Sequence, residues 1–417
     1  MSDDDTMPYS RLNTLAGLLQ RGRGFGARAA LQNPQAAAPL VYDAIRRDWR
    51  WDSTDDRALY LARLLRDLKL SPAPVVDLLT GSQEQCGRAV HVLVLLAVGG
   101  CDEAREALRR YVREGAHWVS ALESLSHRWP LEWWEDLGEV ARARIGAEAE
   151  RPWLTEPWTR FGIEVEGPDP GPIPLDLTGL SDGELLDLLA APDLGASGRV
   201  NVLRELCRRD PVEGLLPLVP SLGTPDGRRP VPWLRRAVDR LGALAVPAAR
   251  RWVCDERPWL AGLGADVLAD HPGPEAIPAL VSELADQRGA RAWCGPDTTA
   301  RRLARFGPAA TAAVPDLRWF WLRTPHSYER TAYLKALAAI GTHGLDHAHT
   351  ESLWDCEGRA RLLGIAHAPG HPETLERIAA LRDDPMEEPE VRAAARTRLT
   401  PTPHRDRHRS RPTAVRP

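Results

Sequence analysis

The stretch FGPAATAAVPDL, residues 306–317, decides the fold of this chain because the chain repeats it. Related stretches lie at 241–249 and 274–280, and a weaker one lies at 215–218. The prolines that mark the four copies are 30, 31 and 37 residues apart. These prolines are Pro217, Pro247, Pro278 and Pro315. A repeat of this length is typical of helical hairpins that stack side by side.

Each copy is interpreted as a turn between two helices. The glycine supplies the backbone freedom that a helix end needs, and the proline that follows suits the first turn of the next helix. One apolar stripe at helical spacing lies on 234–241 and another lies on 332–340. A single hairpin cannot bury such a stripe, so we expect neighbouring hairpins to stack and share a continuous apolar layer.

The second helix of several hairpins follows one pattern. Residues 391–395 read VRAAA, and 329–341 and 234–242 have Arg, small residues and a closing Ile-Gly or Leu-Gly in the same order. This pattern resembles the HEAT repeat family, in the subgroup whose repeats also occur in phycobilin lyases. The resemblance covers roughly residues 180–400 and implies an all-α fold, an α-solenoid of HEAT-like helical hairpins. It implies little about activity, because the family consists mostly of binding scaffolds.

We expect two helical arrays joined by a proline-rich connector. The connector contains six prolines, which cannot continue a helix. Its Trp153, Trp158 and Phe161 are apolar, so part of it should pack against one array. The expected boundaries are 1–50 for a polar tail and a short helix, 51–148 for an array of degenerate repeats, 149–180 for the connector, 181–400 for the HEAT-like array and 401–417 for a disordered basic tail.

Three local features depart from the repeat. Glu329 replaces the apolar residue that is usual in the family. An insertion lies at 288–297, and its residues 293–296 should form an exposed loop, because Gly-Pro breaks a helix there. Gly22, Gly24 and Gly26 lack the strand that precedes a phosphate-binding glycine loop, so we expect a flexible turn there.

The composition favours a protein of the cytoplasm. The first residues are acidic and lack the apolar core of a secretory signal. The longest apolar run, 89–98, is too short to cross a bilayer, so we expect no membrane association. Six cysteines are scattered without a Cys-x-x-Cys pair, which suits reduced thiols.

Charge is divided between the two expected layers of helices. The second helices of the C-terminal hairpins are rich in arginine, whereas the first helices carry a net negative charge. The earliest of these first helices is expected at 212–220. In proteins that resemble HEAT arrays the second helices line the concave surface, so this surface should suit a protein partner with an acidic surface. The candidate residues are Arg236, Arg240, Arg301, Arg302, Arg305, Lys335, Arg359, Arg361, Arg396 and Arg398.

The same charges have a second interpretation as internal pairs. Arg235, Arg330 and Arg392 occupy the position that, in the family, commonly pairs with an Asp on a neighbouring hairpin. The available acidic partners are Asp255, Asp286 and Asp384. Acidic first helices beside basic second helices would then neutralise each other, as charged helix faces usually do.

Aromatic residues near carboxylates indicate an alternative function, nucleic-acid binding. An aromatic face beside an acid can hold a cationic group. DNA alkylation repeat glycosylases are built on HEAT-like hairpins and use this chemistry on cationic damaged bases, and the resemblance to them is one of architecture only. The candidate residues for such base excision are Trp252, Asp255, Glu256, Trp319 and Trp321.

Histidines and one cysteine gather between His343 and His371. His343 and His347 have the i, i+4 spacing of a metal-binding pair. Gly344 and the Pro369-Gly370 break leave this window without a preset geometry, so we expect no metal and no cofactor. Nothing places a nucleophile beside a base, and no small-molecule substrate is evident. The sequence therefore predicts a non-catalytic scaffold or adaptor.

Overall fold

The computed structural model describes residues 9–51, 54–145, 156–163, 177–224 and 226–400. Throughout this part of the chain the regular structure is helical, as predicted, and the one strand-like feature is an isolated antiparallel bridge between Gly223 and Pro230. None of the described helices has the length and apolar character needed to cross a membrane.

The helices fall into a group before the connector and a group after it. The first group contains α1 (Leu15–Gln20), α2 (Gly24–Gln32), α3 (Pro34–Arg46), α4 (Ala58–Asp67), α5 (Ala73–Val76), α6 (Gln83–Val98), α7 (Asp102–Glu114), α8 (Trp118–Arg128) and α9 (Gly138–Arg144). The second group contains α10 (Asp182–Ala190), α11 (Ala196–Leu206), α12 (Leu234–Leu241), α13 (Val246–Trp252), α14 (Pro258–Asp270), α15 (Ile277–Gly289), α16 (Pro296–Ala304), α17 (Val314–Arg323), α18 (Arg330–Ala339), α19 (Asp346–Ser352), α20 (Gly358–His367), α21 (Pro372–Asp383) and α22 (Pro389–Leu399). Short 3-10 turns lie between them, namely η1 (Asp77–Thr80), η2 (Leu131–Trp133), η3 (Glu135–Leu137), η4 (Glu213–Leu215), η5 (Val219–Ser221), η6 (Gly242–Ala245), η7 (Pro274–Ala276), η8 (Gly307–Ala313) and η9 (Ser327–Glu329).

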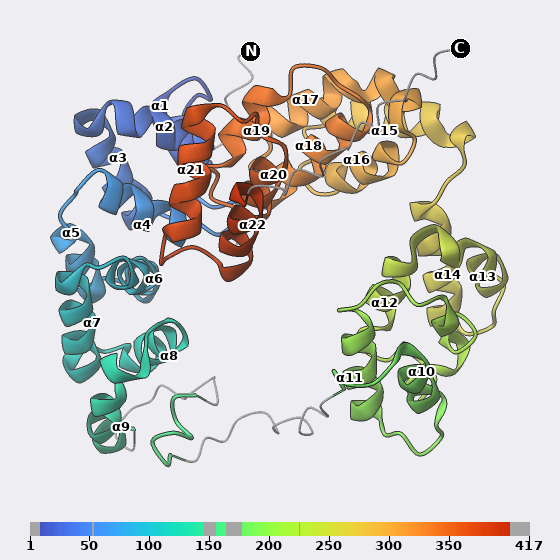
Figure 1. Cartoon of the computed structure of the whole chain (residues 1–417), viewed down its shortest axis with the longest axis horizontal. Coiled ribbons are helices and arrows are strands. Elements are labelled where there is room, and N and C mark those ends of the chain that lie inside the picture. The colour runs from blue at the N-terminus through green and yellow to red at the C-terminus, as the bar shows by residue number, and fades with distance from the viewer. Residues whose placement is uncertain (1–8, 52–53, 146–155, 164–176, 225, 401–417) are drawn as a thin grey trace, which may run out of the picture.

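Neighbouring helices pack in pairs. In the second group α13 packs with α14, α15 with α16, α17 with α18, α19 with α20 and α21 with α22. The second helices of these pairs also contact one another, α16 with α18, α18 with α20 and α20 with α22. In the first group α4, α6 and α8 make successive contacts of the same kind. Figure 1 shows these three on the inner side, with α3, α5 and α7 outside.

The repeated Gly-Pro stretches form the turns that the sequence predicts. Gly242 and Gly307 have φ angles of 57° and 55°, the left-handed conformation that favours glycine. Pro247 and Pro315 lie in the first turns of α13 and α17, where a missing N–H removes no helical hydrogen bond.

The weakest copy of the repeat does not form the helix that we expected at 212–220. The structure has η4 and η5 there instead. Pro217 and Pro220 each lack a backbone donor and clash with the preceding turn, which prevents a continuous α-helix.

Apolar side chains form several buried clusters. One belongs to the first group of helices, and others belong to 177–268, 280–340 and 353–395. The clusters are separate, so the single continuous apolar layer that we expected is not formed by the described residues.

Part of the connector packs against the first group, as expected. Trp158 and Phe161 are buried in the apolar cluster of that group. Trp158 meets Trp118 edge to face, with ring centroids 5.7 Å apart. Trp153, most of the proline-rich segment and the basic tail 401–417 lie outside the described residues.

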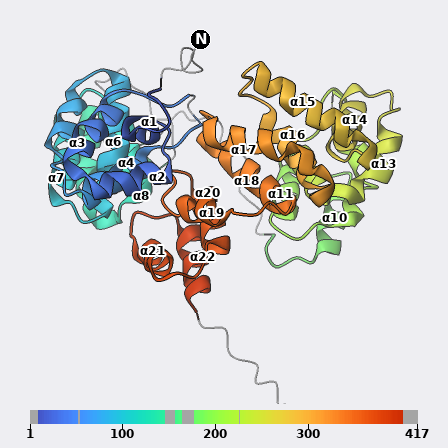
Figure 2. The same ribbon diagram turned by 90° about the horizontal axis from the view of Figure 1, so that it is seen from above.

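The last hairpins fold back onto the first helices. Figure 1 shows α19–α22 beside α1–α4, and Figure 2 shows them between the first group and α10–α18. Arg23 donates to the two carboxylate oxygens of Glu351 at 2.7 and 2.6 Å. Cys356 and Met386 belong to the apolar cluster of the first group. We call this contact region between the two groups the junction.

The glycine-rich segment lies at the junction, and the flexible turn that we expected there is wrong. Gly24 begins α2 and Gly22 has a φ angle of 63°. A Cβ atom on Gly24 would lie 2.0 Å from the carbonyl oxygen of Glu351, and one on Gly22 would lie 2.6 Å from Sγ of Cys356. These glycines let two segments of the chain approach closely, which is a packing role.

Candidate functional site

The inner side of the first group holds a hollow of about 610 Å³, which we call the inner-face cavity. Helices α4, α6 and α8 line it, and the turn between α21 and α22 closes one side. This volume is typical of sites that take a small molecule or a peptide segment. The lining residues are Arg50, Thr54, Asp55, Asp56, Ala58, Leu59, His91, Val94, Leu95, Ser120, Glu123, Ser124, His127, Arg128, Met386 and Glu388.

Helical spacing brings the lining side chains of each helix to one side. On α8, Ser120, Ser124 and His127 are three or four residues apart and all line the cavity. On α6, His91 and Leu95 do the same. The polar side of α8 therefore meets the cavity, while the apolar positions of that helix are buried in the core.

Apolar side chains provide buried parts of the cavity wall. Leu59, Val94, Leu95 and Met386 are each 7% exposed or less. A partner side chain placed against them would lose contact with water, which contributes about 25 cal/mol for each Å² of apolar surface buried.

The rim carries groups of both charges. Asp56 and Arg128 are exposed, and Glu388 is partly exposed. His127, on α8 beside Arg128, is exposed as well. Oε1 of the buried Glu123 accepts a hydrogen bond from Nε1 of Trp158 at 2.8 Å, which orients this carboxylate. Polar groups of both signs around an apolar wall suit a peptide segment better than a uniformly charged ligand.

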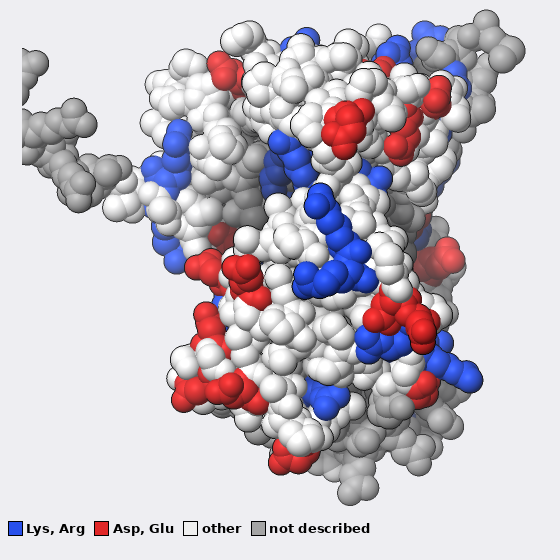
Figure 3. Space-filling model, turned by 90° about the vertical axis from the view of Figure 1, so that its right-hand side faces the viewer, with Lys and Arg blue, Asp and Glu red and all other residues white. Residues whose placement is uncertain are grey.

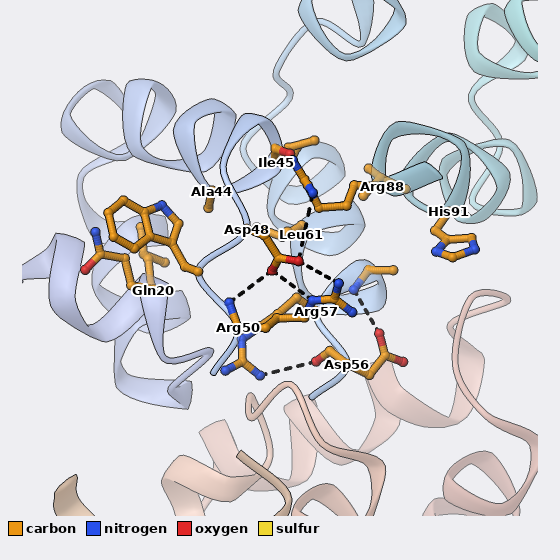
Figure 4. A pocket seen from close by; sticks show the side chains of 14 residues that line it. Gln20, Ala44, Ile45, Asp48, Arg50, Asp56, Arg57, Leu61, Arg88 and His91 are labelled. Carbon is orange, nitrogen blue, oxygen red and sulfur yellow. Dashed lines mark hydrogen bonds and ion pairs between the residues drawn. The ribbon is translucent and has the colours of Figure 1, made fainter. Parts of the chain in front are cut away.

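A smaller hollow of about 60 Å³ adjoins the cavity and shares Arg50, Asp56 and His91 with it. Figure 4 shows Asp48 between Arg50 and Arg88. Arg50 donates to both carboxylate oxygens of Asp48 at 2.8 and 2.6 Å, so its charge is neutralised within the protein. His91 reaches solvent through the cavity, yet the surrounding protein displaces enough water to lower its pKa, which keeps the imidazole neutral at neutral pH.

Buried ion pairs hold the turn that closes the cavity. Arg63 of α4 donates to Asp384 and to Glu387, each at 2.8 Å. Arg361 of α20 donates to both carboxylate oxygens of Glu387, each at 2.8 Å. All four side chains are 6% exposed or less. Because each buried charge is paired, the turn that carries Met386 is fixed against α4.

The structure divides the ten basic residues predicted for the concave surface. Arg361 is buried in the junction, so our prediction that it contacts a partner is wrong. Arg302 pairs with Asp270 at 3.1 Å, and Arg301 pairs with Asp297 of its own helix at 2.7 Å. These two arginines follow the second interpretation, in which charges pair internally.

The other seven predicted residues are exposed, and they differ in how their charges are paired. Arg240 and Arg398 donate to backbone carbonyl groups, and the guanidinium of Arg236 lies 5.0 Å from the ring centroid of Trp233. The remaining four are exposed and make no ion pair with any described residue. They are Arg305, Lys335, Arg359 and Arg396.

Two of the three arginines predicted to form internal ion pairs do so, but with acids other than those we expected. Arg235 pairs with Asp266, and Arg330 pairs with Asp355 at 2.7 Å. In both cases the acid follows the arginine by 25 to 31 residues, which places it on the next hairpin. Arg392 makes no ion pair within the described part of the chain.

The first set of aromatic and acidic candidates does not form an open site. Trp252 is 4% exposed, so its ring faces are inaccessible. Hydrogen bonds from Arg257 hold Asp255 and lower the pKa of its carboxyl group to about 2. Glu256 is exposed and lies next to this pair.

The second set of aromatic candidates already carries cationic groups of the chain itself. The guanidinium of Arg323 lies 5.3 Å from the ring centroid of Trp319, and that of Arg23 lies 4.7 Å from Trp321. Trp293 stacks on Trp319 with centroids 5.3 Å apart, so the insertion packs on α17 and is not the simple exposed loop that we expected. The rings of Trp319 and Trp321, which were expected to hold a cationic base, are therefore already in contact with other side chains of the chain.

The histidine window is spread over the surface and the core. His349 is buried, with its ring centroid 5.2 Å from that of His367. His343, His347 and His371 are exposed. In the described ranges no group of three or more His, Cys, Asp or Glu side chains has an arrangement that would hold a metal ion.

Sequence reasoning missed the inner-face cavity. Apart from Arg50, its residues lie in the 51–148 array, where the repeat signature is degenerate, and in the 384–388 turn. The polar residues at helical spacing on α8 are a local signal that points to one wall. No local signal brings Met386 to α4, because the ion pair beside it joins residues that are 321 positions apart.

No protein-family model, no curated protein and no solved structure matches this chain. Its function therefore has to be inferred from the geometry of the cavity and the junction.

Proposed function

We propose that this protein is a non-catalytic helical-repeat scaffold that binds a segment of a protein partner in the inner-face cavity. The observation that carries the proposal is a hollow of about 610 Å³ that combines an apolar wall with a polar, charged rim. Protein interfaces have the same division, with an apolar centre and a polar edge.

An α-solenoid of HEAT-like hairpins is part of this proposal. It is supported by the successive contacts of α16, α18, α20 and α22 and by those of α4, α6 and α8. Stacked repeats present a long inner surface, and such surfaces are used for binding.

Exposed cations extend the proposed contact to an acidic surface of the partner. Arg305 follows α16, Lys335 lies on α18, Arg359 on α20 and Arg396 on α22. These helices are neighbours, so their charges would act together on an approaching anionic surface and raise its association rate. By contrast, Figure 3 shows a side of the molecule on which positive and negative patches alternate, so that side does not present one sign of charge.

The proposal is tested by filling the cavity. Ser120 is exposed and lines it, so Ser120→Arg places a long cationic side chain in the space that a partner segment would occupy. Ser282 is exposed on α15, so Ser282→Arg makes the same chemical change far from the cavity lining. Tagged wild type and both variants are isolated from the native cell, and the partner found with wild type is purified and its Kd measured.

We expect Ser120→Arg to weaken binding of that purified partner at least tenfold, about 1.4 kcal/mol, and Ser282→Arg to leave it unchanged. Equal affinity of both variants would contradict binding in the cavity. Binding that needs no cavity residue and disappears steeply with added salt would instead indicate a nucleic acid held by the basic residues.

A further inference from the structure

The junction contains a cluster of buried polar groups, and only Asp55 among them also lines the inner-face cavity. The loop at 54–57, just before α4, meets η9 and the turn at 355–358. Asp55 and Ser327 in this cluster are both fully buried. We call these groups the latch cluster, and its members are Asp55, Arg57, Ser327, Arg330, Asp355, Cys356 and Glu357.

The hydroxyl group of Ser327 has three partners. Its Oγ lies 2.6 Å from Oδ1 of Asp55 and 2.7 Å from Nη1 of Arg57, and it also hydrogen-bonds Oε1 of Glu357. A hydroxyl group has one hydrogen to donate and two lone pairs. Arg57 can only donate, so one of the two carboxyl groups accepts the hydroxyl hydrogen. The other carboxyl group must carry a proton and donate it to Oγ.

Glu357 is the group that carries this proton. Asp55 accepts two further hydrogen bonds, from the backbone N–H of Ser327 at 2.7 Å and from that of Trp51 at 3.3 Å, so both of its carboxylate oxygens act as acceptors. Burial is the largest influence on the pKa of Glu357 and raises it, which favours the protonated form that can donate to Oγ of Ser327.

A count of charges leads to the same assignment. The groups of the latch cluster around Glu357 are Asp55 and Arg57 from the loop, Arg330 from α18, and Asp355 and Cys356 from its own turn. Two further charged groups contact this turn and pair with each other, namely Arg361 of α20 and Glu388 before α22. Burial raises the pKa of Cys356 to about 12, so the thiol is neutral. Within the latch cluster two arginines then face two aspartates, so an ionised Glu357 would give the cluster a net negative charge. A buried net charge is unfavourable.

We propose that the latch cluster is a pH-dependent latch, in which a proton on Glu357 holds the loop before α4 against the C-terminal hairpins and its loss loosens the junction. The turn that carries Met386 and Glu388 belongs to the same junction, so loosening it also opens one wall of the inner-face cavity. Only this last consequence rests on the proposed function, because the latch is a property of the unliganded chain.

The direction of the pH effect follows from linkage. A carboxyl group whose pKa is higher in the folded protein binds more protons there than in the unfolded chain. Its contribution to stability is fully present below the ordinary carboxyl pKa and is lost as the pH rises through the higher folded value. The latch is therefore closed on the acidic side and looser on the alkaline side.

Hydrogen exchange of the purified full chain tests the latch. Protection of the amides in 54–66 and 324–334 is measured from about pH 5 to about pH 9 and corrected for the intrinsic pH dependence of exchange. We expect protection of the wild type to fall by roughly two- to tenfold toward high pH, because deprotonation of Glu357 removes one hydrogen bond to Ser327, worth about 0.5–1.5 kcal/mol. Glu357→Gln keeps a donor toward Ser327 without an ionisable group, so its protection should stay constant.

Two further variants keep the test decisive. Glu357→Ala should be weaker at every pH and should also lose the pH dependence, whereas the exposed Glu256→Gln should behave as the wild type does. Equal pH dependence of the wild type and Glu357→Gln overturns the latch. The cavity variant Ser120→Arg should show the exchange pattern of the wild type. A failure of the binding proposal therefore leaves the exchange result unaffected, and a failure of the latch leaves partner binding to be judged by its Kd.

Discussion

Glu329 is a buried acid where the repeat pattern has an apolar residue. Its Oε2 accepts hydrogen bonds from the hydroxyl groups of Thr324 at 2.9 Å and Tyr333 at 2.8 Å. Burial raises the pKa of this carboxyl group to about 7, and the two hydrogen bonds offset part of the increase. The departure from the pattern therefore places a proton-binding group inside the second group of helices.

The substitution Glu329→Gln should change how stability depends on pH. The folded wild type binds this proton more tightly than the unfolded chain, so its free energy of unfolding should fall as the pH rises from 4.5 to about 7. The full loss is on the order of 3 kcal/mol relative to Glu329→Gln, which keeps the hydrogen bonds and has no proton to lose. Urea unfolding of both proteins at several pH values measures the difference, and parallel curves would contradict it.

Gly24 should tolerate no side chain. A Cβ atom there would lie 2.0 Å from the carbonyl oxygen of Glu351, which is backbone and cannot move aside cheaply. We expect Gly24→Ala to lower the free energy of unfolding by about 1–3 kcal/mol or more. Gly87 in α6 has no atom near the same position, so Gly87→Ala should instead stabilise the protein by about 0.5–1 kcal/mol. Thermal unfolding compares them, and equal effects would refute the packing role.

Helix α20 carries two arginines that the sequence does not distinguish. Arg359 is exposed, whereas Arg361, half a turn further along, is fully buried. Arg361 donates to Glu387 and to the carbonyl groups of Asp355 and Cys356 at 2.9 and 2.6 Å. One side of this helix is therefore a binding candidate, and the other side is part of the junction.

Replacing each arginine by methionine should separate the two roles. Arg361→Met leaves buried acceptors without a donor and should cost about 3–5 kcal/mol of folding free energy. Arg359→Met changes a solvated side chain and should stay within about 0.5 kcal/mol of the wild type. Denaturant unfolding midpoints provide the comparison. A small effect of Arg361→Met would show that the junction relaxes around the lost charge.

At the scale of elements, the sequence predicted the helices and turns that depend on residues close together in the chain. The Gly-Pro turns and apolar stripes gave correct helices because glycine, proline and helical spacing act within a few residues. The helix expected at 212–220 does not form because Pro217 and Pro220 interrupt it, although the repeat pattern is weakly present there. The flexible turn expected at Gly22 and Gly24 is wrong because these glycines pack against Glu351 and Cys356, which are distant in sequence.

The molecule as a whole is held by the junction as well as by its chain of hairpins. Arg23 pairs with Glu351 and Arg63 pairs with Asp384 and Glu387, all of them buried. The cavity could not be predicted from the sequence because it needs this contact, which sets the turn at 384–388 against α4 and α6. What the sequence does contain is the polar side of α8, which forms one wall.

Breaking the junction should expand the molecule without unfolding its helices. The double variant Arg23→Met, Arg63→Met removes two buried guanidinium groups. It leaves Glu351 without an ion pair, at about 3–5 kcal/mol. It also takes one of two arginine partners from both Asp384 and Glu387, which keep Arg66 and Arg361. The radius of gyration from small-angle scattering should rise while the helical circular dichroism persists.

The control for this experiment is Arg47→Met with Arg382→Met, which removes two exposed ion pairs. Its radius of gyration should equal that of the wild type. An unchanged radius in the junction variant would mean that apolar packing of Cys356 and Met386 is enough to keep the two groups together.

The separation of Arg23 from Glu351 by 328 positions also bears on how the chain is made. A ribosome adds roughly 5–20 residues per second, so the acid emerges on the order of half a minute after the base that it meets. Throughout that interval, the part of α2 and α4 that later meets the C-terminal hairpins stays exposed on the nascent chain. A chaperone stationed at the exit tunnel would find its longest-lived target there, and a stalled or truncated message would release a product that keeps this surface open.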